Sequence, residues 1–168
     1  MKITFFSILV ISICLIFSSA QAQQLVKTHG DWNVFTLQSK GEKMCYIASS
    51  PKKKSGTYNK RGEPYLIVTH RSKETDEVSA SAGYPFKQGS TVQLSFDKDT
   101  KMELFTTVEV PEVSWAKDSE SDKKIVAAMK KGVELTISGE SREKSTSKDV
   151  YSLKGFTKAY QEMKKACK

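Results

Sequence analysis

The sequence is poor in the residues that most catalytic and metal sites need. Of its 168 residues only two are histidines, His29 and His70, and three are cysteines. It contains no C-x-x-C pair, no G-x-S-x-G nucleophile elbow and no glycine-rich phosphate loop. Two histidines so far apart in the chain give no recognisable metal-ligand spacing. The sequence therefore predicts no cofactor, no metal ion and no set of catalytic residues.

A hydrophobic run long enough to span a bilayer is also missing. The apolar stretch Ile3 to Phe17 has about 15 residues, whereas a membrane-spanning helix needs about 20. It follows the basic Met1-Lys2 and precedes Ala20-Gln21-Ala22, an A-x-A cleavage pattern. We therefore expect residues 1–22 to be a secretory signal peptide cleaved after Ala22, and residues 23–168 to form a single domain. This predicts a periplasmic or secreted protein.

Cysteine is scarce in the expected mature chain, where only Cys45 and Cys167 remain. Two cysteines in an exported protein argue for one disulfide. It would close a loop of about 122 residues and stabilise the fold by roughly 4 to 5 kcal/mol in the chain-entropy model. We expect it to fix a C-terminal helix to the N-terminal third of the domain. The apolar stripe of that helix follows helical spacing and consists of Phe156, Ala159, Tyr160, Met163 and Cys167.

Short alternating runs separated by turn residues fill the chain between the two ends. This spacing is typical of an antiparallel all-β domain, a sandwich or barrel. Tyr65–His70 is a continuous apolar run, which predicts a central strand, and residues 92–106 predict a hairpin. Asp118–Lys131 is expected to be the one internal helix, with Ser119 or Ser121 as its N-cap. The pattern predicts about eight strands and two helices.

Several stretches, taken in order, resemble the invasion-associated locus B family of exported alphaproteobacterial proteins. The resemblance covers essentially all of residues 23–168. It implies an immunoglobulin-like antiparallel β-sandwich, with one short internal helix and a C-terminal helix, in the periplasm or bound to the envelope. It brings no catalytic residue, and the lysine content is higher than expected of a typical member. The stretches are Gly30-Asp31-Trp32, Cys45-Tyr46-Ile47, Lys60 to Tyr65, Gly83 to Phe86, Asp122 to Gly132 and, most specifically, Tyr151 to Phe156.

Positive charge is the one surface feature that points to a function. The full chain carries +8 at neutral pH, and loss of Lys2 leaves +7. Such a density of cations attracts polyanions, which in the periplasm are lipopolysaccharide phosphates, anionic lipid headgroups and acidic proteins rather than nucleic acid. The alternative is a solvated face that only confers solubility. The candidate anion-binding residues are Lys52, Lys53, Lys54, Lys60 and Arg61 in one loop, with Lys158, Lys164, Lys165 and Lys168 along the C-terminal helix.

Three functions are compatible with this sequence. The first is a non-enzymatic envelope protein that binds a partner or an anionic envelope surface, with host contact in a host-associated organism. The second is a periplasmic hydrolase that acts on envelope polymer, favoured if His70 clusters with a carboxylate in a concave pocket and disfavoured if His70 is isolated. The third is a periplasmic inhibitor-type binding module, for example against host lysozyme. It ranks last because lysozyme is itself basic and like charges repel.

Overall fold

The computed structural model describes residues 23–39, 41–71, 75–97 and 100–168, so the expected signal peptide lies outside the described residues. Their fold is an antiparallel β-sandwich with one internal and one C-terminal helix, which confirms the predicted fold class. Every strand pairing is antiparallel. The elements are β1 Gln23–His29, β2 Trp32–Ser39, β3 Glu42–Ser49, β4 Lys53–Gly56, β5 Tyr65–His70, β6 Asp76–Ser81, β7 Thr91–Phe96, β8 Thr100–Thr106, β9 Ser114–Trp115, α1 Ser119–Lys131, β10 Glu134–Glu140, β11 Thr146–Ser152 and α2 Phe156–Ala166.

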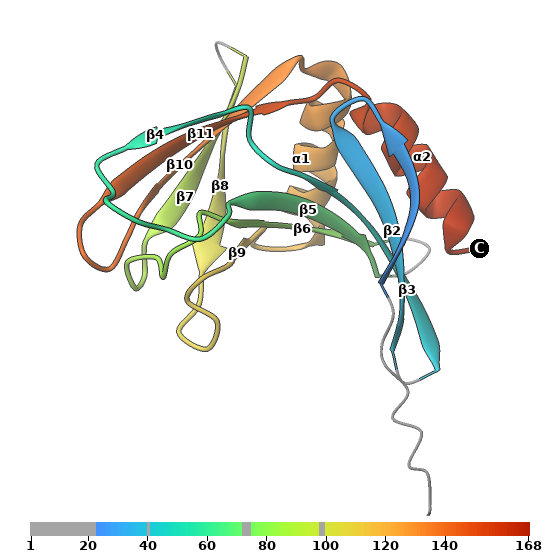
Figure 1. Cartoon of the computed structure of the whole chain (residues 1–168), viewed down its shortest axis with the longest axis horizontal. Coiled ribbons are helices and arrows are strands. Elements are labelled where there is room, and N and C mark those ends of the chain that lie inside the picture. Colours follow the sequence, from blue (N-terminus) through green and yellow to red (C-terminus); the bar gives the residue numbers. More distant parts are fainter. Residues whose placement is uncertain (1–22, 40, 72–74, 98–99) are drawn as a thin grey trace, which may run out of the picture.

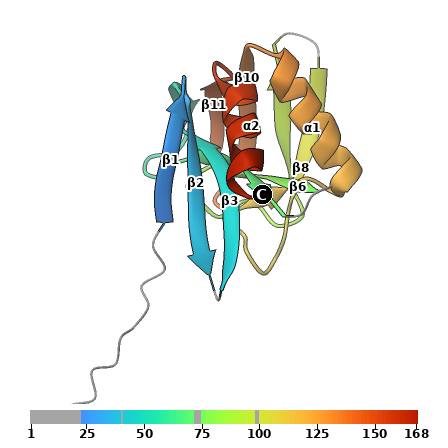
Figure 2. The same cartoon turned by 90° about the vertical axis from the view of Figure 1, so that its right-hand side faces the viewer.

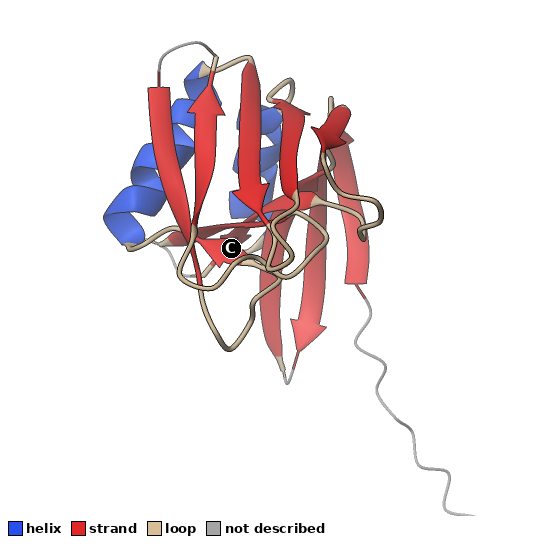
Figure 3. Cartoon of the chain, turned by 90° about the vertical axis from the view of Figure 1, so that its left-hand side faces the viewer, coloured by secondary structure: helices blue, strands red, loops and turns tan. Residues whose placement is uncertain are grey.

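The strands form one hydrogen-bonded sheet in the order β1-β2-β3-β5-β6-β9-β8-β7-β10-β11-β4. The two-residue strand β9 is the narrow link between the halves, because it pairs with only two residues of β6 and two of β8. The sheet bends so that its two ends form separate layers (Figures 1 and 3). Its free edges are β1 and β4, and both helices lie side by side on the same side of the molecule (Figure 2).

The core follows the period-2 alternation that the sequence shows. Val92, Leu94 and Phe96 of β7 are buried, while the residues between them are partly exposed. Cys45 and Ile47 of β3 alternate in the same way. Both layers and both helices contribute to a single apolar cluster, so the expected mature domain has one common core.

Helix α2 is attached to the β1–β3 end of the sheet. Its buried residues are Phe156, Ala159 and Met163, and the ring of Phe156 meets Trp32 edge to face at 4.9 Å between centroids. The disulfide between Cys45 and Cys167 is present, with 5.9 Å between the two Cα atoms. The predicted attachment of the C-terminal helix to the N-terminal third is therefore confirmed.

Helix α1 packs against β6 and buries Ile125, Val126 and Met129 as predicted. The predicted cap was wrong. The N-cap is Asp118, one residue before Ser119, and its carboxylate accepts from the Ser121 N–H at 2.8 Å. A carboxylate can cap the helix as a serine does, and its negative charge is also stabilised by the positive end of the helix dipole.

Three strands were not expected, namely β1, β4 and β9, so the described residues hold eleven strands rather than about eight. Strand β4 falls in the stretch predicted to be a basic loop, and its residues pair with β11. All four of its residues are exposed. An edge strand without a buried face has no alternation to detect, because its pairing comes from the open edge of its neighbour.

Candidate functional site

The predicted basic loop is largely paired with acids. Lys52 Nζ lies 2.5 Å from the Asp31 carboxylate, whose pKa this contact lowers. Lys54 Nζ lies 3.1 Å from Glu63. Counting Arg61, which pairs with Asp149, three of the five candidate cations have acidic partners, which reduces the net attraction of this surface for an anion.

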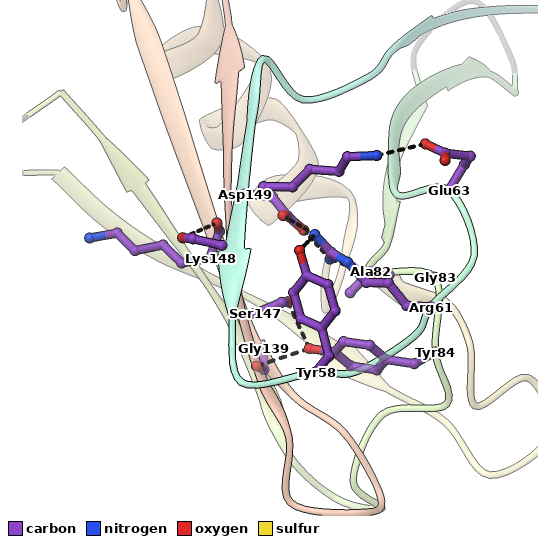
Figure 4. A network of polar contacts seen from close by, with 12 residues as sticks. Tyr58, Arg61, Glu63, Ala82, Gly83, Tyr84, Gly139, Ser147, Lys148 and Asp149 are labelled. Carbon is purple, nitrogen blue, oxygen red and sulfur yellow. Dashed lines mark hydrogen bonds and ion pairs between the residues drawn. The ribbon is translucent and has the colours of Figure 1, made fainter.

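Arg61 has almost no exposed side-chain surface. Its side chain is only 3% exposed and Asp149 only 2%. Its two terminal nitrogens donate to the two Asp149 oxygens at 2.7 and 2.5 Å, and one also donates to the Ala82 carbonyl at 3.0 Å (Figure 4). Burial alone would lower the pKa of Arg61, but the bonds to Asp149 hold it above its ordinary value. The prediction that Arg61 binds an anionic surface is therefore corrected, because its charge is already satisfied inside the fold.

A cleft lies beside this ion pair, and two tyrosines form part of its wall. Arg61 donates to the Tyr58 hydroxyl at 3.0 Å and its guanidinium carbon lies 4.0 Å from the ring centroid. The Tyr84 hydroxyl donates to the Gly139 carbonyl at 3.0 Å and lies 2.7 Å from the Ser147 hydroxyl (Figure 4). We call the cavity, of about 420 Å³, the tyrosine cleft. It is lined by Tyr58, Asn59, Lys60, Gly83, Tyr84, Pro85, Ser141, Arg142, Glu143 and Ser145.

His70 is not isolated, since its Nδ1 lies 2.7 Å from the Asp76 carboxylate. Asp76 also accepts from Lys164 Nζ at 3.1 and 3.2 Å and from the Tyr160 hydroxyl. Burial alone would raise the pKa of Asp76, but these bonds from Tyr160, His70 and Lys164 outweigh it and lower the pKa. The cluster ties α2 to β5 and β6.

A groove of about 310 Å³ runs between α1 and α2 next to this cluster, and we call it the helix groove. Asp76 lines it, but His70 is not among its lining residues. The condition set for a hydrolase is thus met only in part: the histidine has a carboxylate partner, yet its ring does not form the wall of the concavity. The lining residues are Asp76, Asp122, Lys123, Val126, Ala127, Lys130, Tyr160 and Lys164.

Asp122 in the helix groove serves the sheet. The Val78 carbonyl accepts from the Ala116 N–H at 3.3 Å, and the N–H and C=O of one strand residue point to the same side. Because β9 is too short to pair with the Val78 N–H, Asp122 accepts from it at 2.8 Å. Burial raises the pKa of Asp122 despite this bond. The burial of the Asp122 carboxylate is therefore explained by its hydrogen bond to the sheet.

The two helices and the C-terminal residue carry six exposed lysines without an acidic partner among the described residues, and other such lysines, among them Lys53 and Lys60, lie elsewhere. Lys130 Nζ lies 3.9 Å from the Tyr160 ring centroid, while Lys124 is neutralised by Glu120 at 2.7 Å. The α1 lysines escaped sequence reasoning, although helical spacing puts Lys123 and Lys130 on one stripe. We call the exposed, unpaired set the helix-face lysines: Lys123, Lys130, Lys131, Lys158, Lys165 and Lys168.

Metal-binding clusters and membrane-spanning helices are both missing from the described ranges. No group of three or more histidine, cysteine, aspartate or glutamate side chains there is placed to hold a metal ion. Neither α1 nor α2 has the length and apolar composition needed to cross a bilayer.

The fold and these surfaces define a disulfide-linked antiparallel β-sandwich with two basic helices on one side. The chain belongs to the invasion associated locus B (IalB) protein family, whose family model matches residues 32–164. Among solved structures it is similar to invasion associated protein B from Bartonella henselae, with 18% sequence identity, a TM-score of 0.60, and coverage of 83% of this chain and 95% of that one. At this identity the likeness supports the fold. A comparison with curated proteins gave no match.

Proposed function

We propose that this IalB-family protein is an exported, non-enzymatic envelope protein that binds an anionic envelope surface through the helix-face lysines. The observation that carries the proposal is the difference between its two basic regions. In the predicted loop, Arg61 is buried and Lys52 and Lys54 have acidic partners. On the two adjoining helices, a set of exposed lysines lacks any acidic partner among the described residues.

Exposed lysines on two neighbouring helices act together. Each lysine near an anionic bilayer surface contributes about 1 kcal/mol, and the attraction falls off within a Debye length of about 10 Å at 0.1 M salt. Several such residues on two neighbouring helices therefore give measurable, salt-sensitive binding without inserting into the bilayer. Contact with a host surface in a host-associated organism would use the same chemistry.

The test is cosedimentation of the oxidised mature protein, residues 23–168, with vesicles. We expect binding to vesicles that contain phosphatidylglycerol, no binding to phosphatidylcholine alone, and release by 0.5 M salt. Reversing Lys123, Lys130 and Lys165 to glutamate should weaken binding by more than about 100-fold, at about 1 kcal/mol per lysine. The control variant reverses Lys53 and Lys60, which leaves the helices unchanged. Weakening by both variants in proportion to the number of lysines reversed would show that net charge acts rather than the helices.

A hydrolase remains the second candidate because His70 and Asp76 are in contact beside the helix groove. The test is incubation of the protein with purified peptidoglycan, followed by measurement of soluble fragments. Fragment release that is lost in His70→Ala but kept in Lys165→Gln would replace the binding proposal with an enzyme. No release would remove this candidate.

A further inference from the structure

The tyrosine cleft shares no lining residue with the helix groove, and it is a separate site. Backbone hydrogen bonds fix both of its walls. Gly62 N–H donates to the Gly83 carbonyl at 2.8 Å, and Arg142 N–H donates to the Pro85 carbonyl at 3.0 Å. Ser141 N–H closes its own loop by donating to Ser145 at 2.7 Å. A cavity whose walls are held by main-chain bonds is largely preformed, as ligand sites usually are.

The buried ion pair explains how an irregular segment keeps its shape here. Tyr58 and Arg61 clasp each other through a hydroxyl hydrogen bond and a ring contact, and Asp149 holds Arg61. The two residues between them, Asn59 and Lys60, are exposed and line the cleft. The ion pair thereby holds the chain on both sides of Asn59 and Lys60, whose amide and ammonium groups lie at the rim.

The lining has the mixed chemistry that a sugar requires. The partly exposed Tyr58 ring and Pro85 supply most of the apolar surface, against which the C–H face of a sugar ring packs, while Tyr84 is largely buried behind them. Hydroxyl, amide and charged groups around the rim match a ring of sugar hydroxyls. Lys60 and Arg142 against Glu143 leave one net positive charge. A volume of about 420 Å³ lies within the range of roughly 300 to 1,000 Å³ for small-molecule sites.

We propose that the tyrosine cleft binds a sugar unit that carries a carboxylate. The sugar ring lies against the tyrosine and proline wall, and the carboxylate pairs with Arg142, whose planar guanidinium matches a carboxylate in two parallel hydrogen bonds. Lys60 adds a second cation to the lining. This proposal does not depend on the function of the helix-face lysines.

The test is a titration of the ¹⁵N-labelled, oxidised mature protein with glucuronic acid, with glucose, and with an acidic dipeptide. We expect amide shifts in residues 58–60, 83–84 and 141–145, and an affinity for glucuronic acid about tenfold above that for glucose, the worth of one charge-assisted contact. Arg142→Gln, at an exposed position, should abolish this difference, while Lys165→Gln should keep it. Tyr58→Leu should weaken both sugars alike.

Each other result overturns the proposal. Shifts outside these segments, or none with either sugar, would show that the cleft is no sugar site. Equal affinities for glucose and glucuronic acid in the native protein would show that the cleft does not recognise the carboxylate. Tighter binding of the dipeptide than of glucuronic acid would assign the cleft to an acidic peptide. Vesicle binding that persists in any of these cases would leave the helix face as a separate function.

Discussion

Two residues far apart in the sequence, Arg61 and Asp149, hold the most buried charges described here. Asp149→Asn would leave the Arg61 charge in place without a counter-charge. We expect a loss of about 3 to 5 kcal/mol in the free energy of unfolding, the usual cost of breaking a buried ion pair. Lys54→Gln is the matched control, because it breaks an ion pair that is exposed on both sides and should cost less than about 1 kcal/mol. Urea unfolding of both variants measures the difference. Similar small losses would mean that water reaches Arg61.

Asp122 and Asp76 should respond to pH in opposite directions. The raised pKa of Asp122 means that it favours folding below about pH 4, and that this contribution is lost as the pH rises through the folded pKa. The lowered pKa of Asp76 gives stability that is present above about pH 4 and is lost as the pH falls.

The substitution that tests this is Asp122→Asn, which removes the charge and keeps an acceptor for the Val78 N–H. Its stability relative to the native protein should rise from pH 3 to pH 7, while that of Asp76→Asn should fall over the same range. Asp122→Ala, the control that lacks the acceptor, should lose about 1 to 3 kcal/mol. Unfolding curves at pH 3, 5 and 7 measure all three variants. A stability of Asp122→Asn relative to the native protein that falls with rising pH would contradict the assigned sign.

At the residue scale, sequence reasoning found the disulfide and missed the ion pair. Cys45 and Cys167 could be paired because only two cysteines remain in the expected mature chain. Arg61 has many acids to choose from, and its partner lies 88 positions away. Lysines and arginines in one polar stretch look alike in sequence, so nothing distinguishes the buried Arg61 from the exposed Lys60 beside it.

At the scale of elements, the start of α2 depends on a close approach to the β1–β2 turn. Gly155 has φ +92°, and a Cβ there would lie 1.9 Å from the His29 carbonyl oxygen. We expect Gly155→Ala to lower the free energy of unfolding by about 1 to 2 kcal/mol, the cost of a left-handed backbone for a residue with a Cβ. Displacement of the turn by the new methyl group should add to this loss. Gly89→Ala is the matched control, because its φ is +70° but no atom lies within 4 Å of the added carbon. Thermal unfolding should therefore show a clearly larger loss for Gly155→Ala, and equal losses would mean that the turn moves freely.

The disulfide fixes the opposite end of α2. It spans a loop of 122 residues, so reduction or Cys167→Ser should lower the melting temperature, with an upper estimate of roughly 4 to 5 kcal/mol. The Asp76 cluster and the Phe156 contact with Trp32 still hold the helix. We therefore expect faster amide exchange in the last turn of α2, while residues 156–160 change less. An unchanged melting curve after verified reduction would show that the disulfide contributes little.

Elements with a buried face could be predicted, and those without one could not. The hairpin of β7 and β8, the central β5 and both helices show clear periodicity, although turn residues 98 and 99 lie outside the described residues. Strand β4 is exposed throughout and pairs only because β11 offers an open edge. The sequence of the predicted basic loop likewise shows no periodicity that would separate the edge strand β4 from residues 58–60, which line the tyrosine cleft.

At the scale of the whole molecule, charge and cavity are divided between two regions. The helix-face lysines lie on α1, on α2 and at the C-terminal residue, whereas the tyrosine cleft is lined by the segments around Tyr58, Tyr84 and Arg142. The sequence predicted a basic protein and could not say which cations remain unpaired, since that depends on contacts such as Lys52 with Asp31. One surface suits an extended anion and the other a small ligand, so the two proposals can be tested in one purified protein.

The position of the mature N-terminus tests whether the protein is exported. Strand β1 begins at Gln23, directly after the expected cleavage site, and pairs with β2 along its length. Cleavage after Ala22 would keep every described residue of β1, whereas a cut several residues later would remove part of this edge strand. Peptide mass mapping of protein expressed in a bacterium with its full leader should give a first residue of Gln23 in the periplasmic fraction. Leucine in place of both Ala20 and Ala22 should leave the precursor uncut, because the A-x-A site requires small residues. Uncleaved native protein in the cytoplasm would show that residues 1–22 are not a signal peptide. It would also contradict the proposal that the protein binds a partner in the envelope.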